Sequence, residues 1–217
     1  MRIIFLSIFL LLATPVQAFV SEAIMQESLL DITTIEDPVR AQTFYGDLVD
    51  FPHTYQIVST KPFHLFVQIK VPDIESSTDN LFGIIIKEPV GKGRVQEVAR
   101  LKGSGTAWES SFEWWGFDSY RNGPSFEQDL GPGTYRIEVS TPDNRDKYVL
   151  SVGTQSEVSF NYFDMVRRAM DVKVFFGKSR LRVVESPLVF VPVLGIGGFV
   201  AFWYRRRVST VRDVILK

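Results

Sequence analysis

One apolar segment near the C-terminus limits how this chain can fold. Pro187 to Tyr204 runs for about 18 residues without a charged side chain, which suits a helix that crosses a bilayer. Two aromatic residues close the segment and three arginines follow at once, as at the cytoplasmic end of a membrane anchor. A buried core helix would not be expected to end in this way. We expect a transmembrane helix over 187–204 and a short basic cytoplasmic tail over 205–217. The anchor residues are Trp203, Tyr204, Arg205, Arg206 and Arg207.

The N-terminus has the pattern of an export signal. Arg2 precedes an apolar run from Ile3 to Leu12, and the small residue Ala18 follows Val16 by two positions. Such a run is too short to span comfortably, and the small residue marks a cleavage site. We expect a signal peptide over 1–18, with an uncleaved anchor as the alternative. Either way we expect the middle of the chain outside the cytoplasm and its tail inside. With the signal peptide cleaved, we expect a single-pass protein of the cell membrane.

Composition narrows the possible partners. The chain has 217 residues and no cysteine, so an exported domain here must hold itself without disulfides. Residues 19–159 contain 12 basic and 21 acidic residues, and an acidic surface of this kind argues against nucleic acid. The expected partners are therefore the lipid bilayer and either another envelope protein or a glycan. The pattern indicates no oligomeric state.

Short strands separated by turn residues fill the middle of the chain. Phe63 to Val71 alternates apolar and polar side chains, as a strand with one buried face does. The alternation returns from Tyr135 to Val139 and from Tyr148 to Val152, and Pro142 to Arg145 predicts a hairpin turn between these two runs. Weaker strand patterns cover 55–57, 81–86 and 95–101. We expect an all-β, antiparallel β-sandwich over residues 19–156.

After the last predicted strand, the spacing of apolar residues changes from that of a strand to that of a helix. Apolar side chains recur at spacings of three and four, at Phe163, Val166, Met170 and Val174. Gly177 is placed to end this helix. We expect an amphipathic, basic stem over residues 157–186. Two placements are open: a helix packed on the sandwich, or a helix on the membrane surface near anionic lipid.

The run from Gly133 to Gly153 contains a glycine-threonine-tyrosine strand, a polar turn and a tyrosine-x-leucine strand. It resembles the closing hairpin of pre-peptidase C-terminal-type domains, which are bacterial extracytoplasmic jelly-roll-like sandwiches that accompany secreted enzymes. From about Pro38 to Glu185 the chain is similar to uncharacterised bacterial membrane-anchored β-sandwich proteins. The residues that carry this second resemblance are Phe44–Leu48, Pro52–His53, Lys61–Phe63, Val71–Asp73, Gly123–Pro124 and Phe175–Ser179. The resemblances imply a jelly-roll-like fold and no particular activity.

Carboxylates gather at Asp73, Glu75 and Asp79. Oxygen ligands of this kind suit calcium, although the spacing is not that of an EF-hand loop. Because sandwiches that this chain resembles sometimes bind calcium, the cluster is a weak calcium candidate, with a solvated turn as the alternative. We expect no other cofactor or metal, since the chain has no thiolate ligands.

Aromatic residues are dense between residues 108 and 120, among carboxylates. Exposed rings in such surroundings stack on sugars or form hot spots at protein interfaces. The candidate contacts to a ligand or partner are Trp108, Trp114, Trp115 and Tyr120. Packing in the core is the alternative, although Trp114 and Trp115 cannot share one layer if they are neighbours in a strand.

These patterns leave three functions. We favour a non-enzymatic binding or adhesion module for a protein or a glycan. The second is a structural or accessory subunit of a membrane complex that docks through its transmembrane helix, where Gly195, Gly197 and Gly198 permit close contact. The third, an exported hydrolase, is least favoured because no nucleophile elbow and no His-Glu-x-x-His motif is present. It would need a pocket that joins His53 or His64 to a serine and a carboxylate.

Overall fold

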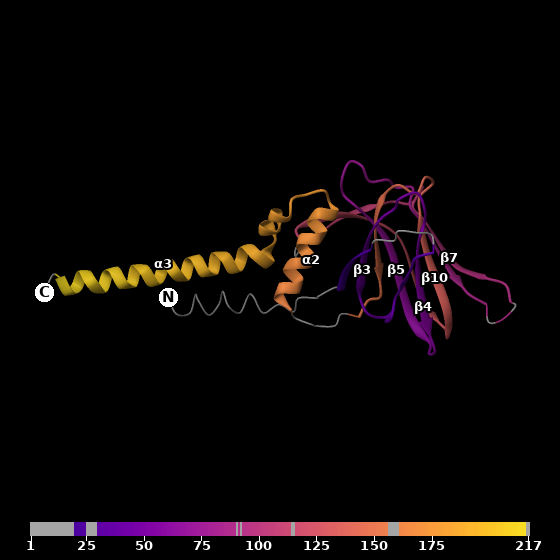
Figure 1. The fold of residues 1–217 in the computed structure, drawn as a ribbon, viewed down its shortest axis with the longest axis horizontal. Coiled ribbons are helices and arrows are strands. Elements are labelled where there is room, and N and C mark those ends of the chain that lie inside the picture. The colour runs from indigo at the N-terminus through magenta and orange to yellow at the C-terminus, as the bar shows by residue number, and fades with distance from the viewer. Residues whose placement is uncertain are drawn as a thin grey trace.

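The computed structural model describes residues 20–24, 30–89, 91, 93–113, 116–155 and 161–215. A β-sandwich forms one end of an elongated molecule, and a long helix extends away from it (Figure 1). The predicted signal peptide, residues 1–18, lies outside the described residues.

The described strands form two packed sheets. The six-stranded sheet contains, in spatial order, β1 (Val20–Ile24), β3 (Gln42–Asp47), β11 (Lys147–Val152), β5 (Phe63–Pro72), β9 (Asp118–Leu130) and β8 (Glu109–Glu113). The five-stranded sheet contains β2 (Ile32–Thr34), β4 (His53–Ser59), β10 (Gly133–Ser140), β6 (Phe82–Lys87) and β7 (Gln96–Lys102). Neighbouring strands are antiparallel except in the parallel pairs β1–β3 and β2–β4. The predicted all-β sandwich is confirmed.

Alternating side chains fill the space between the sheets. Every second residue of β5 is buried, beginning with Phe63, and Tyr135, Ile137 and Val139 of β10 face it from the opposite sheet. β11 differs, because five consecutive residues of it are buried. Its outer face is therefore covered as well as its inner face.

The predicted hairpin between β10 and β11 is wrong. β10 pairs with β4 and β6 in the five-stranded sheet, whereas β11 pairs with β3 and β5 in the six-stranded sheet. The connection over residues 141–146 therefore crosses from one sheet to the other. Alternation shows which side chains face the core but not which sheet a strand joins, so a hairpin and a crossing have the same sequence pattern.

Helix α2 (Tyr162–Phe175) covers the outer face of the six-stranded sheet. The Asn161 side chain accepts a hydrogen bond from the Asp164 backbone N–H and caps the helix. After Phe175, Gly177 has a φ of 69° and ends it, as predicted. The buried side of α2 packs against Tyr45 and Val149 of the sheet. Of the two placements left open by the sequence, the structure shows the helix packed on the sandwich.

A short 3₁₀ helix, η1 (Arg180–Glu185), leads into helix α3 (Pro187–Ile215). Among the described residues, the window Pro187–Arg206 of α3 is long and apolar enough to cross a membrane, with a mean hydropathy of 1.8 and none of it buried. Trp203 and Tyr204 are 49% and 66% exposed. Arg205 and Arg206 are also exposed, and the side chain of Arg207 lies outside the described part. The helix continues through the predicted tail rather than ending at Tyr204.

Gly46 of β3 lies against the ring of Tyr148, its partner in β11. A Cβ at this position would overlap the ring, so we expect Gly46→Ala to lower the free energy of unfolding by about 1–3 kcal/mol. Denaturant unfolding of the full chain in detergent measures the change. Gly131→Ala is the matched control, because nothing lies within 4 Å of its added Cβ. Equal losses in both variants would contradict the close packing of Gly46.

Candidate functional site

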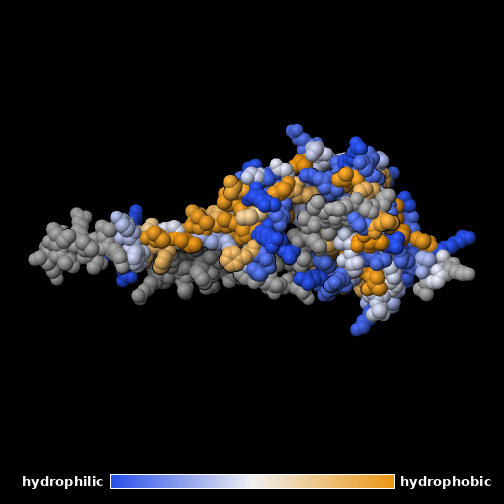
Figure 2. Space-filling model, viewed as in Figure 1, coloured by the Kyte–Doolittle hydropathy of each residue, from blue (hydrophilic) through white to orange (hydrophobic). Residues whose placement is uncertain are grey.

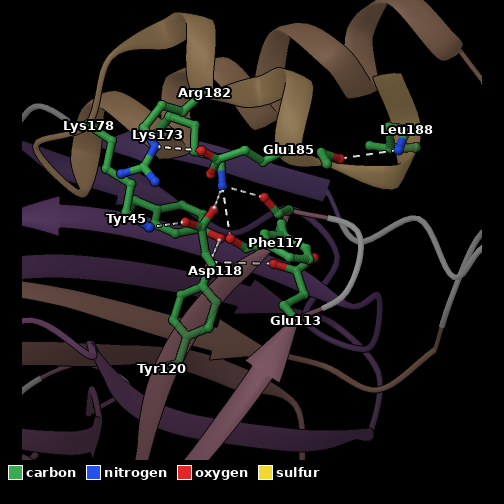
Figure 3. Close-up of polar contacts among 12 residues, drawn as sticks. Tyr45, Glu113, Phe117, Asp118, Tyr120, Lys173, Lys178, Arg182, Glu185 and Leu188 are labelled. Carbon is green, nitrogen blue, oxygen red and sulfur yellow. Dashed lines mark hydrogen bonds and ion pairs between the residues drawn. The ribbon is translucent and has the colours of Figure 1, made fainter. Parts of the chain in front are cut away.

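A buried ion pair lies where α2 meets the turn between β8 and β9 (Figure 3). Lys173 Nζ is 2.8 Å from Asp118 Oδ2, and neither side chain is exposed to solvent. Lys173 also donates to the carbonyl oxygens of Gly116 and of Phe117, the latter at 3.0 Å. The ammonium group therefore has an acceptor for each of its three protons. We call the following set the junction: Glu113, Asp118, Tyr120, Lys173 and Lys178.

The Asp118 carboxylate is equally well satisfied. Lys178 Nζ lies 2.8 Å from its second oxygen, Oδ1. A buried carboxylate without partners would cost several kcal/mol, so both contacts are needed to keep this charge out of water. Phe117 has a φ of 59°, which is uncommon for a large side chain. The turn held in that conformation supplies the two carbonyl groups that accept from Lys173.

Tyr120 and Glu113 extend this network into the sheet. The Tyr120 hydroxyl lies 2.9 Å from the Tyr45 hydroxyl and donates to the Glu113 carboxylate at 3.4 Å. Burial raises the pKa of Glu113, and the charge of Asp118 raises it further. Burial likewise raises the pKa of Tyr120 and lowers the pKa of Lys70. These three shifts disfavour the charged forms of Glu113, Tyr120 and Lys70.

Further contacts tie the sheet to α2 and α2 to α3. Lys147 of β11 donates to the Phe175 carbonyl at 2.7 Å, and its ammonium lies over the Phe175 ring. On the other side of α2, the Tyr162 hydroxyl donates to the Leu188 carbonyl of α3 at 2.9 Å. Val183 of η1, the short helix that connects α2 to α3, is also buried. The sandwich is therefore held in a fixed orientation to the start of α3. Because Lys173 and Asp118 at the centre of the junction have fixed partners and no exposure to solvent, this pair suits the attachment of α2 to the sheet.

Two of the four predicted aromatic contacts are described: Tyr120 is buried, and Trp108 is partly buried. Tyr120 is 6% exposed and lies against the Phe176 ring. Trp108 packs against the core, and its indole N–H donates to the Gly103 carbonyl at 3.1 Å. For these two residues the structure shows the core alternative. Trp114 and Trp115 lie outside the described residues.

Arg121 lies between two of the carboxylates proposed as weak calcium ligands. Its guanidinium pairs with Asp79 and lies 3.9 Å from Asp73, while Glu75 is exposed. In the part of the chain that is described, no group of three or more histidine, aspartate or glutamate side chains is placed to hold a metal ion. The sequence does not reveal this arrangement, because Arg121 follows Asp79 by 42 residues.

The two histidines lie in different sheets. His53 of β4 is buried, with Nδ1 2.8 Å from the Tyr148 hydroxyl. His64 of β5 is exposed, with its ring nitrogens 2.9 Å from Glu127 and 2.8 Å from Asp129. Neither ring contacts a serine hydroxyl within the described ranges. These residues give no positive indication of a catalytic site.

The outer face of the five-stranded sheet carries a surface that the sequence analysis did not single out. On β6, Phe82, Ile84 and Ile86 alternate with buried residues and point away from the core. We call these three side chains the β6 row. Charged residues flank the row in register: Glu138 and Arg100 beside Ile84, and Arg136 and Glu97 beside Ile86. An apolar centre with a charged rim is typical of protein interfaces. The signal in the sequence is a strand that is apolar on both faces.

Comparisons with known proteins find a likeness among solved structures but none among sequences. No model of a protein family matches the chain, and no curated protein sequence matches it. A solved structure of the pre-peptidase C-terminal domain of a collagenase from Bacillus anthracis matches with 12% identity and a TM-score of 0.37. The match covers 58% of this chain and 98% of that domain. The fold described above rests on the strand pairing in this chain.

Removing Lys173 should loosen α2. Loss of one partner of a buried pair costs about 3–5 kcal/mol, and we expect Lys173→Met to lie at the lower end because Lys178 still pairs with Asp118. Denaturant unfolding of the full chain in detergent measures it. The control is Arg182→Met, which breaks the exposed pair with Glu185 and should change stability by less than about 1 kcal/mol. Similar small effects of both variants would show that the buried pair does not hold the helix.

The two histidines should affect stability in opposite directions as pH changes. Burial lowers the pKa of His53 below 6.5. As pH falls below 6.5, the unfolded chain takes up this proton before the folded chain does, so stability is lost on acidification. Hydrogen bonds that His64 donates to the carboxylates of Asp129 and Glu127 raise the pKa of His64 above 6.5. Its stabilising contribution is complete below 6.5 and is lost as pH rises through its folded-state pKa.

Each histidine serves as the control for the other. We expect His53→Gln to reduce the loss of stability on the acidic side, and His64→Gln to reduce the loss on the alkaline side. The free energy of unfolding of both variants is measured between about pH 5 and pH 8, where histidine titrates. If both substitutions change the slope of the free energy of unfolding against pH in the same direction, these assignments are contradicted.

Proposed function

We propose that this protein is a membrane-anchored β-sandwich that acts outside the cytoplasm as a non-enzymatic binding module for another protein. The observation that carries the proposal is the contrast between the two sheets. α2 is fixed to the outer face of one sheet by a buried ion pair. On the outer face of the other sheet, the β6 row lies among charged neighbours.

Membrane anchoring is supported by the exposure of α3. No residue of its apolar window is buried in the chain itself, so about 20 residues of apolar helix would meet water unless lipid or protein covers them. Exposed Trp203 and Tyr204, followed by Arg205 and Arg206, have the order of an interfacial belt and a cytoplasmic flank. The export signal predicted for residues 1–18 supports an outside position for the sandwich.

A protein partner is favoured over a glycan by the chemistry of the open sheet. Sugar platforms use exposed aromatic rings, whereas of the described candidates Tyr120 is buried and Trp108 is partly buried against the core. The β6 row instead offers two isoleucines and one phenylalanine, with charges of both signs at its rim. Such a rim sets register and specificity at protein interfaces. A role for Trp114 and Trp115 stays a prediction from the sequence.

A second candidate function is that of an accessory subunit that docks through α3. Gly195, Gly197 and Gly198 have no neighbouring atom within 4 Å of an added Cβ. Small residues on an uncovered helix allow another helix to approach closely in lipid. This function places the contact inside the membrane rather than on the sandwich.

Site-specific photo-crosslinking in native membranes tests the two candidates against each other. A photoreactive amino acid replaces Ile84 in the β6 row, Glu109 on the edge strand β8, or Ile196 in α3. We expect a discrete protein adduct from the Ile84 position and none from the exposed Glu109 position. An adduct from Ile196 alone would favour the accessory subunit. No adduct from Ile84, or equal adducts from Ile84 and Glu109, would contradict binding through the β6 row.

A further inference from the structure

The surface of α2 and η1 that faces away from the sandwich combines exposed apolar side chains with arginines. Phe163 is 82% exposed, Leu181 78% and Val184 57%. Apolar and charged side chains lie together over this region, where α3 begins (Figure 2). A single exposed leucine needs no explanation. Three such residues on the two elements that lead into a membrane-length helix are instead typical of a surface that meets a membrane or a protein.

The placement of α2 brings this surface to the level of the bilayer interface. The apolar window of α3 begins at Pro187, directly after η1. The hydrogen bond from the Tyr162 hydroxyl to the Leu188 carbonyl joins the first turn of α2 to the first turn of α3. α2 runs crosswise to α3 (Figure 1). When α3 stands upright in a membrane, α2 therefore lies along the membrane plane.

The arginines of this surface suit phosphate. Arg167 and Arg180 are exposed, and neither makes a hydrogen bond or ion pair with another described residue. A guanidinium group presents donors that match a phosphate in a bidentate fashion. Exposed aromatic and aliphatic side chains beside such cations are the composition of a helix at the membrane interface. The lysines of the stem do not contribute, because Lys173 and Lys178 are held by Asp118.

We propose that Phe163, Leu181 and Val184 insert at the boundary between headgroups and acyl chains of the bilayer that α3 spans, while Arg167 and Arg180 bind lipid phosphates. This inference rests on the membrane anchoring proposed above. We call these five residues the lipid-facing surface. Lipid is the occupant rather than another protein because the surface is continuous with the start of the spanning helix. Since Lys173 and Asp118 fix α2 on the sheet, the lipid contact sets the height and tilt of the whole sandwich.

Single spin labels on the full chain test this surface directly. The natural sequence has no cysteine, so each variant carries one label: Leu181→Cys in the lipid-facing surface, Val58→Cys on the sandwich or Ile196→Cys in α3. The three side chains are 78%, 59% and 66% exposed, so a label should not disturb the fold. Each protein is reconstituted in nanodiscs of phosphatidylcholine and phosphatidylglycerol. Accessibility to lipid-soluble oxygen is compared with accessibility to a water-soluble nickel chelate.

We expect the label at Leu181 to favour oxygen over the nickel chelate, at a depth between the labels at Ile196 and Val58. If Leu181 is as accessible to the chelate as Val58 while Ile196 is in lipid, the lipid contact fails and the anchoring stands. If Ile196 is also in water, the anchoring itself fails. A Leu181 label shielded from both reagents would overturn the inference in favour of a protein contact.

The arginines are tested by charge removal in the same discs. Combined Arg167→Gln and Arg180→Gln should move the Leu181 label several-fold toward chelate accessibility when phosphatidylglycerol is present, since each arginine near an anionic surface contributes about fivefold to attraction. The control is Arg94→Gln, an exposed arginine in the loop before β7, which should not move the label. An unchanged depth after the double substitution would overturn the role of the arginines.

Discussion

Asp118 and Lys173 are both withdrawn from water, and the placement of every element after the sandwich follows from how they are satisfied. Lys173 needs three acceptors, and the turn between β8 and β9 supplies them as one carboxylate oxygen and two carbonyl groups. A buried charge tolerates few alternative positions, because any shift of the helix would leave it without partners. The pair therefore fixes the rotation and register of α2 on the six-stranded sheet more narrowly than apolar contacts alone would do.

The position of α2 decides which of the two sheets has its outer face covered by a helix. It buries the outer side of β3 and β11, which explains why β11 is buried on both faces. The same helix is linked to the first turn of α3 through Tyr162. A sandwich joined to α3 by a flexible linker would present all of its faces in turn. This sandwich instead presents the outer face of the five-stranded sheet in a set direction, and the β6 row lies on that face.

The sandwich holds itself without disulfides. Its inner layer is apolar apart from a small polar group in which His53, Tyr148 and Tyr55 are linked by hydrogen bonds of 2.8 and 2.6 Å. Gly46 makes room for the Tyr148 ring at this point. Cross-linking of the chain is thus replaced by close packing and by polar contacts that are specific in geometry, at the core and again at the junction.

Properties that depend on neighbouring residues were open to prediction. The alternation at Phe63–Val71 and Tyr135–Val139, the helical spacing after residue 160, the stop at Gly177 and the apolar length of α3 all follow from local periodicity, and the structure agrees with them. Properties that depend on distant residues were decided only by the tertiary structure. The crossing between β10 and β11 depends on which strands pair. The alternation of apolar and polar residues does not indicate that pairing. In the sequence, Lys173 is one more basic residue of the stem. Only the fold brings it to Asp118, which lies 55 residues earlier in the chain. Burial is a property of the whole packed molecule rather than of any segment. The sequence therefore did not show that Tyr120 is buried or that Trp108 packs against the core.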